Sequence, residues 1–175
     1  MMTIAMIYAT SQNGALGHNQ TIPWKSKVEL ARFQAATFNK TLIIGRKTWE
    51  SLPYPVERKN LIVLSANPLA DKTVRWANTL ERALGTAENG EGMDAVIVGG
   101  AGLFQTAMNS CHIVYKSTIL VDIGGNVRAP IIPASRFKLV WVRNIKDYPA
   151  YSYQTFLTRE LESKKLTTDF GLLIS

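Results

Sequence analysis

The pattern of hydrophobic and polar positions divides the chain into short apolar runs and longer amphipathic stretches. Several runs consist almost only of Ile, Val and Leu, which is typical of β-strands that are covered on both faces. The pattern predicts strands at Ile4–Thr10, Thr41–Ile44, Asn60–Leu64, Ala95–Val98, His112–Val121, Phe137–Ile145 and Tyr151–Thr158. It predicts helices at Lys27–Thr37, Lys47–Leu52, Thr79–Ala87 and Ala101–Met108.

The order of these elements indicates the fold class. Strands and helices alternate as far as Met108, which favours right-handed crossovers and parallel strands. The last three predicted strands follow one another without a helix, and turn residues such as Asp147-Tyr148-Pro149 lie between them. The sequence therefore predicts an α/β fold with a central mixed, mostly parallel sheet, flanking helices and an antiparallel C-terminal edge hairpin. The number of flanking helices expected is four.

Length and organisation are those of a single domain. The chain has 175 residues and contains no repeat, low-complexity segment or Pro/Gly-rich linker. We expect residues 1–159 to form the domain and residues 160–175 to be a C-terminal extension. The apolar residues of that extension either pack on the domain or fray with the terminus.

Charge and composition exclude several kinds of partner. The formal net charge is +7, but the basic residues are scattered and no aromatic-basic RNA-binding motif is present, so we expect no nucleic acid partner. A basic surface also attracts small phosphorylated ligands. No apolar run reaches the length of a membrane span and no secretory leader is evident, so we expect a cytoplasmic protein without a membrane partner. Nothing in the sequence demands a dimer, so a monomer is expected.

Cysteine and histidine content argues against disulfides and metals. Cys111 is the single cysteine, which excludes an internal disulfide. His18 and His112 lie far apart in the sequence and show no ligand spacing. We therefore expect no metal site.

Glu29 is a carboxylate on an apolar stretch of the first predicted helix. It lies one helical turn before Phe33, so the two side chains share a face that Leu30 borders. A buried carboxylate needs strong donors or becomes protonated, and the amino-amidine edge of a flat heterocycle would supply two donors. The alternative is a capping box, Ser26-Lys27-Val28-Glu29, in which Glu29 only stabilises the helix start.

Two predicted strands enter helices through glycine. The segments are Gly45-Arg46-Lys47-Thr48 and Gly99-Gly100-Ala101-Gly102, and neither matches a P-loop or a complete dinucleotide fingerprint. Two such turns at the ends of parallel strands indicate a nucleotide-binding crevice. Arg46, with the Ser65 hydroxyl, would favour a cofactor that carries a ribose 2′-phosphate. The alternative for Arg46 is a surface ion pair.

These segments, in this order, resemble dihydrofolate reductase from about Thr3 to Arg159. The stretch from Ala9 to Trp24 is similar to the first strand and active-site loop of the family, and Glu29 falls where the family keeps its buried acidic residue. The segment from Gly45 to Leu52 is close to the most specific motif of the family. In this family the residues that correspond to Gly99 and Gly100 are joined by a cis peptide.

The resemblance implies reduction of 7,8-dihydrofolate to tetrahydrofolate by NADPH, with hydride transfer to C6 and protonation at N5. It also implies a role for each of the following residues. The catalytic set is Glu29, Trp24 and Ser117, where the Ser117 hydroxyl meets the carboxylate. The substrate-binding set is Ile7, Tyr8, Leu30, Phe33, Leu52, Arg58 and Tyr115, where Arg58 holds the glutamate tail. The cofactor-binding set is Ala9, Leu16, Gly17, Gly45, Arg46, Lys47, Thr48, Leu64, Ser65, Val98, Gly99, Gly100, Ala101, Gly102, Leu103 and Phe104.

Two other functions stay open on the sequence. One is a related NADPH reductase that acts on another pterin or on a pyrimidine, such as a ribosylamino-pyrimidine. The other is a non-catalytic relative that has kept the fold. Trp24, Glu29, Phe33 and Arg58 argue against the first, because together they resemble pterin and glutamate-tail contacts.

Overall fold

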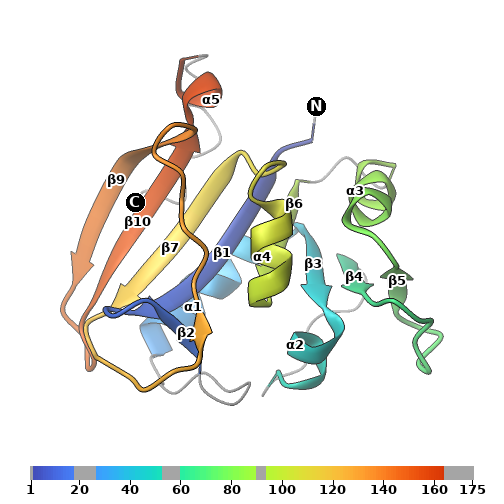
Figure 1. Cartoon of the computed structure of the whole chain (residues 1–175), viewed down its shortest axis with the longest axis horizontal. Coiled ribbons are helices and arrows are strands. Elements are labelled where there is room, and N and C mark those ends of the chain that lie inside the picture. The colour runs from blue at the N-terminus through green and yellow to red at the C-terminus, as the bar shows by residue number, and fades with distance from the viewer. Residues whose placement is uncertain (1, 18–26, 53–59, 90–93, 164–175) are drawn as a thin grey trace.

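A computed structural model describes the protein at residues 2–17, 27–52, 60–89 and 94–163. The strands of its main sheet are β1 (Ile4–Ser11), β3 (Thr41–Gly45), β4 (Leu61–Leu64), β5 (Arg75–Ala77), β6 (Ala95–Gly99), β7 (Ile113–Ile119), β9 (Phe137–Ile145) and β10 (Tyr151–Thr158). Their order across the sheet is β5-β4-β3-β6-β1-β7-β10-β9 (Figure 1). The pairs from β5 to β7 are parallel, and β10 pairs antiparallel with both β7 and β9. This arrangement confirms the mixed sheet and its antiparallel C-terminal edge.

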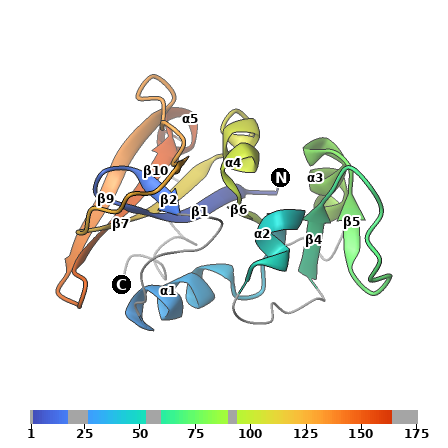
Figure 2. The ribbon, with the colours of Figure 1, turned by 60° about the horizontal axis from the view of Figure 1, so that its bottom comes forward.

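The helices lie on both faces of this sheet. They are α1 (Lys27–Thr37), α2 (Arg46–Glu50), α3 (Leu80–Glu88), α4 (Ala101–Ala107) and α5 (Arg159–Ser163). Figure 2 shows α1 on one side of the sheet and α4 on the other. No helix within the described ranges is both long and apolar enough to span a membrane.

Two apolar clusters fill the spaces on either side of the sheet. One includes Tyr8 and Phe104 and packs α3 and α4 against the sheet. The other includes Ile7 and Tyr115 and packs Phe33 of α1 against the opposite face. Ile7 and Tyr8 point to opposite faces because side chains alternate along a strand. The central strands are therefore covered on both sides, which explains their unbroken apolar sequences.

The described elements include four that the apolar pattern did not predict. β2 (Ala15–Gly17) and β8 (Val127–Arg128) form a separate two-stranded sheet, and β5 and α5 are also short. Strands of two or three residues are too short to show a period of their own, so β2, β5 and β8 form through pairing with other strands. The described residues thus form five helices, where four were expected. The additional helix, α5, is joined to β9 by an ion pair of 2.5 Å between Lys138 Nζ and Glu162 Oε1.

Candidate active site

Glu29 lies in the first turn of α1, and its side chain is partly buried. Burial raises the pKa of its carboxyl above the ordinary value of 4.5, because a low-dielectric surrounding disfavours the charged form. Phe33, one turn further along, packs against the apolar cluster on this face of the sheet. The expected sharing of one helix face by Glu29 and Phe33 is thus consistent with their packing. Ser26, the N-cap of the alternative capping box, lies outside the described residues.

The apolar cluster beside α1 gathers four of the predicted substrate-binding residues. Ile7 and Tyr115 are buried members of the cluster, and Phe33 and Leu52 pack against it. Leu30 is a partly buried residue of α1. Residues from β1, β7, α1 and the segment after α2 therefore pack into one apolar cluster on the face of the sheet that α1 covers.

One predicted substrate-binding residue, Tyr8, stands apart from that group. Tyr8 points to the opposite face of the sheet, where its ring centroid lies 5.1 Å from that of Phe104. Its side chain therefore groups with the predicted cofactor residues and not with the substrate residues. Trp24 and Arg58 lie outside the described residues.

Ser117 is buried in β7, next to the strand that carries Ile7. Its Cα partners are Ala9 in β1 and Tyr153 in β10. Burial raises the pKa of the Tyr153 hydroxyl, while the charge of Arg32 and hydrogen bonds with Arg32 and Ser117 oppose the rise. The negative charge of Glu29 raises the same pKa. Tyr153 is therefore the residue on which the influences of Glu29, Arg32 and Ser117 meet.

The two glycine turns lie against each other at the carboxyl ends of neighbouring strands β3 and β6. Gly99 and Gly100 are joined by a cis peptide, as the resemblance implied, and Gly99 has φ +128°, a conformation that L side chains rarely adopt. A Cβ on Gly45 would lie 3.4 Å from the Gly99 carbonyl oxygen, and a Cβ on Gly100 would lie 2.8 Å from Thr48 Oγ1. Glycine is therefore favoured at Gly99 by the backbone conformation and at Gly100 by the close approach of Thr48, whereas a Cβ on Gly45 would make a tight but ordinary contact.

The starts of α2 and α4 present backbone N–H groups without a capping side chain, because both N-cap residues are glycines. By contrast, α3 is capped by Thr79, whose hydroxyl oxygen accepts a hydrogen bond from the Arg82 N–H. Uncapped N–H groups beside a glycine cradle suit the pyrophosphate of a dinucleotide. The residues at this place fit such a cofactor.

Arg46 and Ser65 line one cavity of about 500 Å³ at the end of β4. Arg46 Nη1 donates to both carboxylate oxygens of Glu50 at 3.0 Å, so the surface ion pair considered above is present. Ser65 Oγ donates to the Asn67 carbonyl oxygen at 2.7 Å. An exposed ion pair stabilises a protein by only ~0–1 kcal/mol. Little free energy is therefore needed for Arg46 to leave Glu50 and bind a phosphate group instead.

The remaining cofactor-set residues divide by position. Leu16, Leu64, Leu103 and Phe104 lie in or against the cluster that contains Tyr8. Val98 packs on the cluster beside α1, and Ala9 packs against a third cluster around Ile119, Tyr151 and Tyr153. Lys47 is exposed on α2, Ala101 and Gly102 are in the first turn of α4, and Gly17 ends β2.

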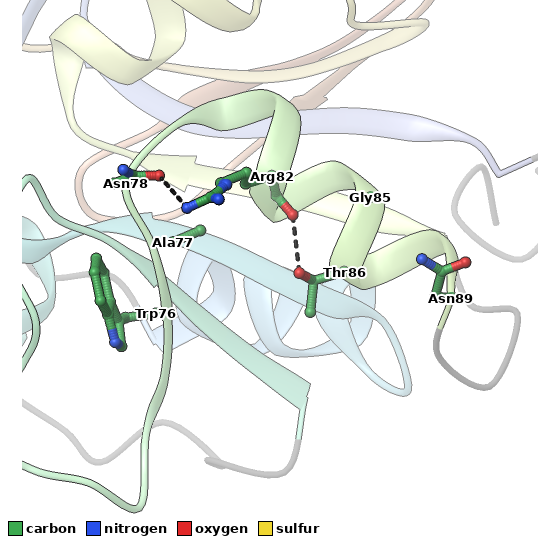
Figure 3. A pocket seen from close by; sticks show the side chains of 7 residues that line it. All are labelled: Trp76, Ala77, Asn78, Arg82, Gly85, Thr86 and Asn89. Carbon is green, nitrogen blue, oxygen red and sulfur yellow. Dashed lines mark hydrogen bonds between the residues drawn. The ribbon is translucent and has the colours of Figure 1, made fainter.

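Another hollow, of about 380 Å³, lies between β5 and α3 (Figure 3). Its lining includes Trp76 and Arg82, and Arg82 Nη1 donates to Asn78 Oδ1 at 3.3 Å. Among the residues that the structure describes, none of the predicted site residues lines it. It is therefore separate from the group around Glu29 and from the glycine turns.

Sequence reasoning missed Arg32 and Tyr153. The spacing of Arg32, three residues after Glu29, was a signal that the two share a helix face. Tyr153 carried no signal, because its position beside Ser117 depends on the pairing of β7 with β10.

The fold and the site together are those of an α/β protein whose glycine turns suit a phosphorylated nucleotide, with an apolar cluster and the partly buried carboxylate of Glu29. Residues 3–160 match the family model for dihydrofolate reductase. The chain therefore belongs to the dihydrofolate reductase family of NADPH-dependent oxidoreductases.

Individual relatives agree with this assignment. The chain is 34% identical over 166 residues to the dihydrofolate reductase of Buchnera aphidicola subsp. Acyrthosiphon pisum (strain APS), covering 93% of this chain and 91% of the relative. It is 33% identical over 155 residues to the type 15 dihydrofolate reductase of Escherichia coli, covering 87% and 97%. A solved dihydrofolate reductase from Enterococcus faecalis, complexed with NADP(H) and RAB-propyl, superposes with a TM-score of 0.80 at 28% identity, covering 90% and 96%.

Proposed function

We propose that this protein reduces 7,8-dihydrofolate to 5,6,7,8-tetrahydrofolate, with NADPH as the reductant. The observation that carries the proposal is the partly buried carboxylate of Glu29 on the same face of the sheet as Ile7, Phe33 and Tyr115. NADPH, when bound, supplies the hydride that reduces C6 of the pterin. The chain supplies position, electrostatics and exclusion of water.

Glu29 is the proposed recognition and polarising group. In its ionised form it accepts hydrogen bonds from N3 and the 2-amino group of the pterin, which makes N5 more basic. Because N5 lies on another part of the ring, a water molecule is the proposed proton donor and not Glu29 itself. Burial strengthens these hydrogen bonds, since they act in a low dielectric. The Ser117 hydroxyl is proposed to donate a hydrogen bond to the carboxylate and so to orient it.

The glycine turns and Arg46 are the proposed cofactor site. The backbone N–H groups beside Gly45, Gly99 and Gly100, which approach one another closely, are proposed to hold the pyrophosphate. Arg46 and Ser65, on one cavity, are proposed to hold the ribose 2′-phosphate and thus to select NADPH over NADH. Tyr8, which packs on Phe104, belongs to this side of the sheet.

The test is the fall in near-ultraviolet absorbance of NADPH when dihydrofolate is added to the purified protein, with mass spectrometry of the folate product. A gain of two hydrogen atoms by the substrate supports the proposal. Oxidation of NADPH with a ribosylamino-pyrimidine but not with dihydrofolate would favour the related reductase. Binding of NADPH without oxidation in the presence of either compound would favour a non-catalytic relative.

We also propose that the protein acts as a cytoplasmic monomer and binds no nucleic acid. The scattered basic residues and the complete main sheet of one chain support this proposal. Light scattering coupled to size-exclusion chromatography measures the mass in solution, and a mass of twice 19.4 kDa would contradict the monomer.

A further inference from the structure

Arg32 lies three residues after Glu29 on α1, so the two side chains share one side of the helix. Within α1, all of which the structure describes, Ala36 is the one fully buried residue, and it lies in the C-terminal half. The residues from Lys27 to Arg32 are exposed or partly buried. The half of α1 that carries Glu29 is therefore not held by buried apolar side chains of its own.

Arg32 makes the described contact that joins this half of α1 to the antiparallel edge of the sheet. Its Cζ atom lies 3.2 Å from the ring centroid of Tyr153 and 5.0 Å from that of Trp141. Tyr153 on β10 is only 2% exposed, and the two rings meet edge to face with centroids 6.2 Å apart. A planar guanidinium stacks on such rings better than an ammonium group does.

Tyr153 connects this contact to the catalytic set. It is the Cα partner of Ser117 across the β7–β10 pair. Hydrogen bonds of its hydroxyl with Arg32 and Ser117 lower its pKa, against the rise that burial causes. A displacement of Arg32 would thus change the position of Glu29 on one side and the surroundings of Ser117 on the other.

We propose that Arg32 is a positioning residue: by stacking on Tyr153 and Trp141, it holds the N-terminal half of α1 against the sheet and sets the place of the Glu29 carboxylate relative to Ser117. The inference rests on the proposed function, because its readout is dihydrofolate reduction. Arg32 is assigned no contact with substrate or cofactor. Its effect on the reaction passes through Glu29.

The test is a double-mutant cycle that combines Arg32→Met with Glu29→Gln. Methionine keeps most of the side-chain length but lacks the charge and the planar group. We expect Arg32→Met to lower kcat about tenfold, the equivalent of about 1.4 kcal/mol, with the KM for NADPH unchanged. In the Glu29→Gln background the same substitution should lower kcat by less than about twofold, because the group that Arg32 positions is already lost.

Two further variants separate positioning from general stability. Arg32→Lys should recover part of the kcat, since it restores the charge without the stacking plane. Arg136→Met is the matched control. Arg136 lies with its Cζ atom 5.5 Å from the Phe137 ring centroid, and it donates to the Cys111 carbonyl oxygen at 2.9 Å, apart from Glu29. It should lower the melting temperature and leave kcat unchanged. If Arg32→Met does not fold, Trp141→Leu serves in the same cycle with a smaller expected loss.

A kcat for Arg32→Met within about twofold of wild type would overturn the inference. A loss of equal size in the wild-type and Glu29→Gln backgrounds would also overturn it, because Arg32 would then act independently of the carboxylate. Failure of the wild-type protein to reduce dihydrofolate would refute the proposed function instead. The two failures are therefore distinguishable.

Discussion

Glu29→Gln removes one charge at nearly constant shape, and it separates the proposed role of Glu29 from a capping role. If the charge polarises the pterin, turnover near neutral pH should fall by about 10²–10⁴, the range for a group that assists proton transfer. Steady-state oxidation of NADPH in the presence of dihydrofolate measures this loss. Glu81→Gln is the matched control, because Glu81 is an exposed carboxylate in the first turn of α3.

Stability should change in the opposite direction to activity. Burial raises the pKa of Glu29 above 4.5. The ionised form of Glu29 is therefore less stable in the folded protein than in the unfolded chain. A carboxylate in the first turn of a helix gains only ~0.3–1 kcal/mol from the helix dipole. Loss of the charge should therefore stabilise the ligand-free protein at neutral pH, and each kcal/mol raises the melting temperature by about 2–4 °C at this chain length.

The pH dependence of this difference has a definite sign. Between the unfolded and the raised folded pKa of Glu29, the folded protein binds more protons than the unfolded chain does. The free energy of unfolding therefore falls as the pH rises through that window, which begins near 4.5. The stabilisation that the protonated Glu29 carboxyl gives at lower pH is lost above the folded pKa. The advantage of Glu29→Gln should grow over the same window and then level off.

Two results would refute this reasoning. One is wild-type turnover in Glu29→Gln. The other is a melting temperature that falls in Glu29→Ala but not in Glu29→Gln, because glutamine can also complete a capping box whereas alanine cannot. Together they would establish the capping box as the role of Glu29.

Three further predictions concern the cofactor cradle and the far end of the substrate. Arg46→Ala should weaken NADPH binding by about 1.5–3 kcal/mol and leave NADH binding nearly unchanged in fluorescence titrations. Equal weakening of both cofactors would contradict a contact between Arg46 and the 2′-phosphate. Gly100→Ala should lower the free energy of unfolding by about 1–3 kcal/mol in chemical denaturation, because its Cβ would lie 2.8 Å from Thr48 Oγ1. Adding Thr48→Ala should restore part of this stability, and a double variant no more stable than Gly100→Ala would contradict the clash. Arg58, outside the described residues, is expected from the resemblance to bind the glutamate tail, so Arg58→Leu should raise the KM for dihydrofolate far more than for a dihydropterin without glutamate. An equal effect on both substrates would contradict that role.

The amino-acid sequence alone determined the central strands and the four helices α1 to α4. β9 and β10 have the predicted bounds, and the other predicted strands differ by one or two residues at their ends. Strands covered on both faces must be apolar throughout, and turn residues must separate them, so both features are local and readable. The glycine turns and the carboxylate of Glu29 were also visible, because each is an unusual residue type for its local surroundings.

Only the tertiary structure decided which of these pieces meet. The contact between the Gly45 and Gly99–Gly100 turns depends on β3 and β6 being neighbours, although the sequence places β4 and β5 between them. The pairing of β2 with β8 and the position of Tyr153 beside Ser117 likewise join segments far apart in the chain. Such contacts form because burial of the two apolar clusters and backbone pairing act on the whole sheet at once, and no local pattern records them. The stacking of Arg32 on Tyr153 and Trp141 is a contact of this kind. The sequence shows that Arg32 lies near Glu29 on the helix, because the two are three residues apart. It does not show the aromatic rings, because they come from strands near the other end of the chain.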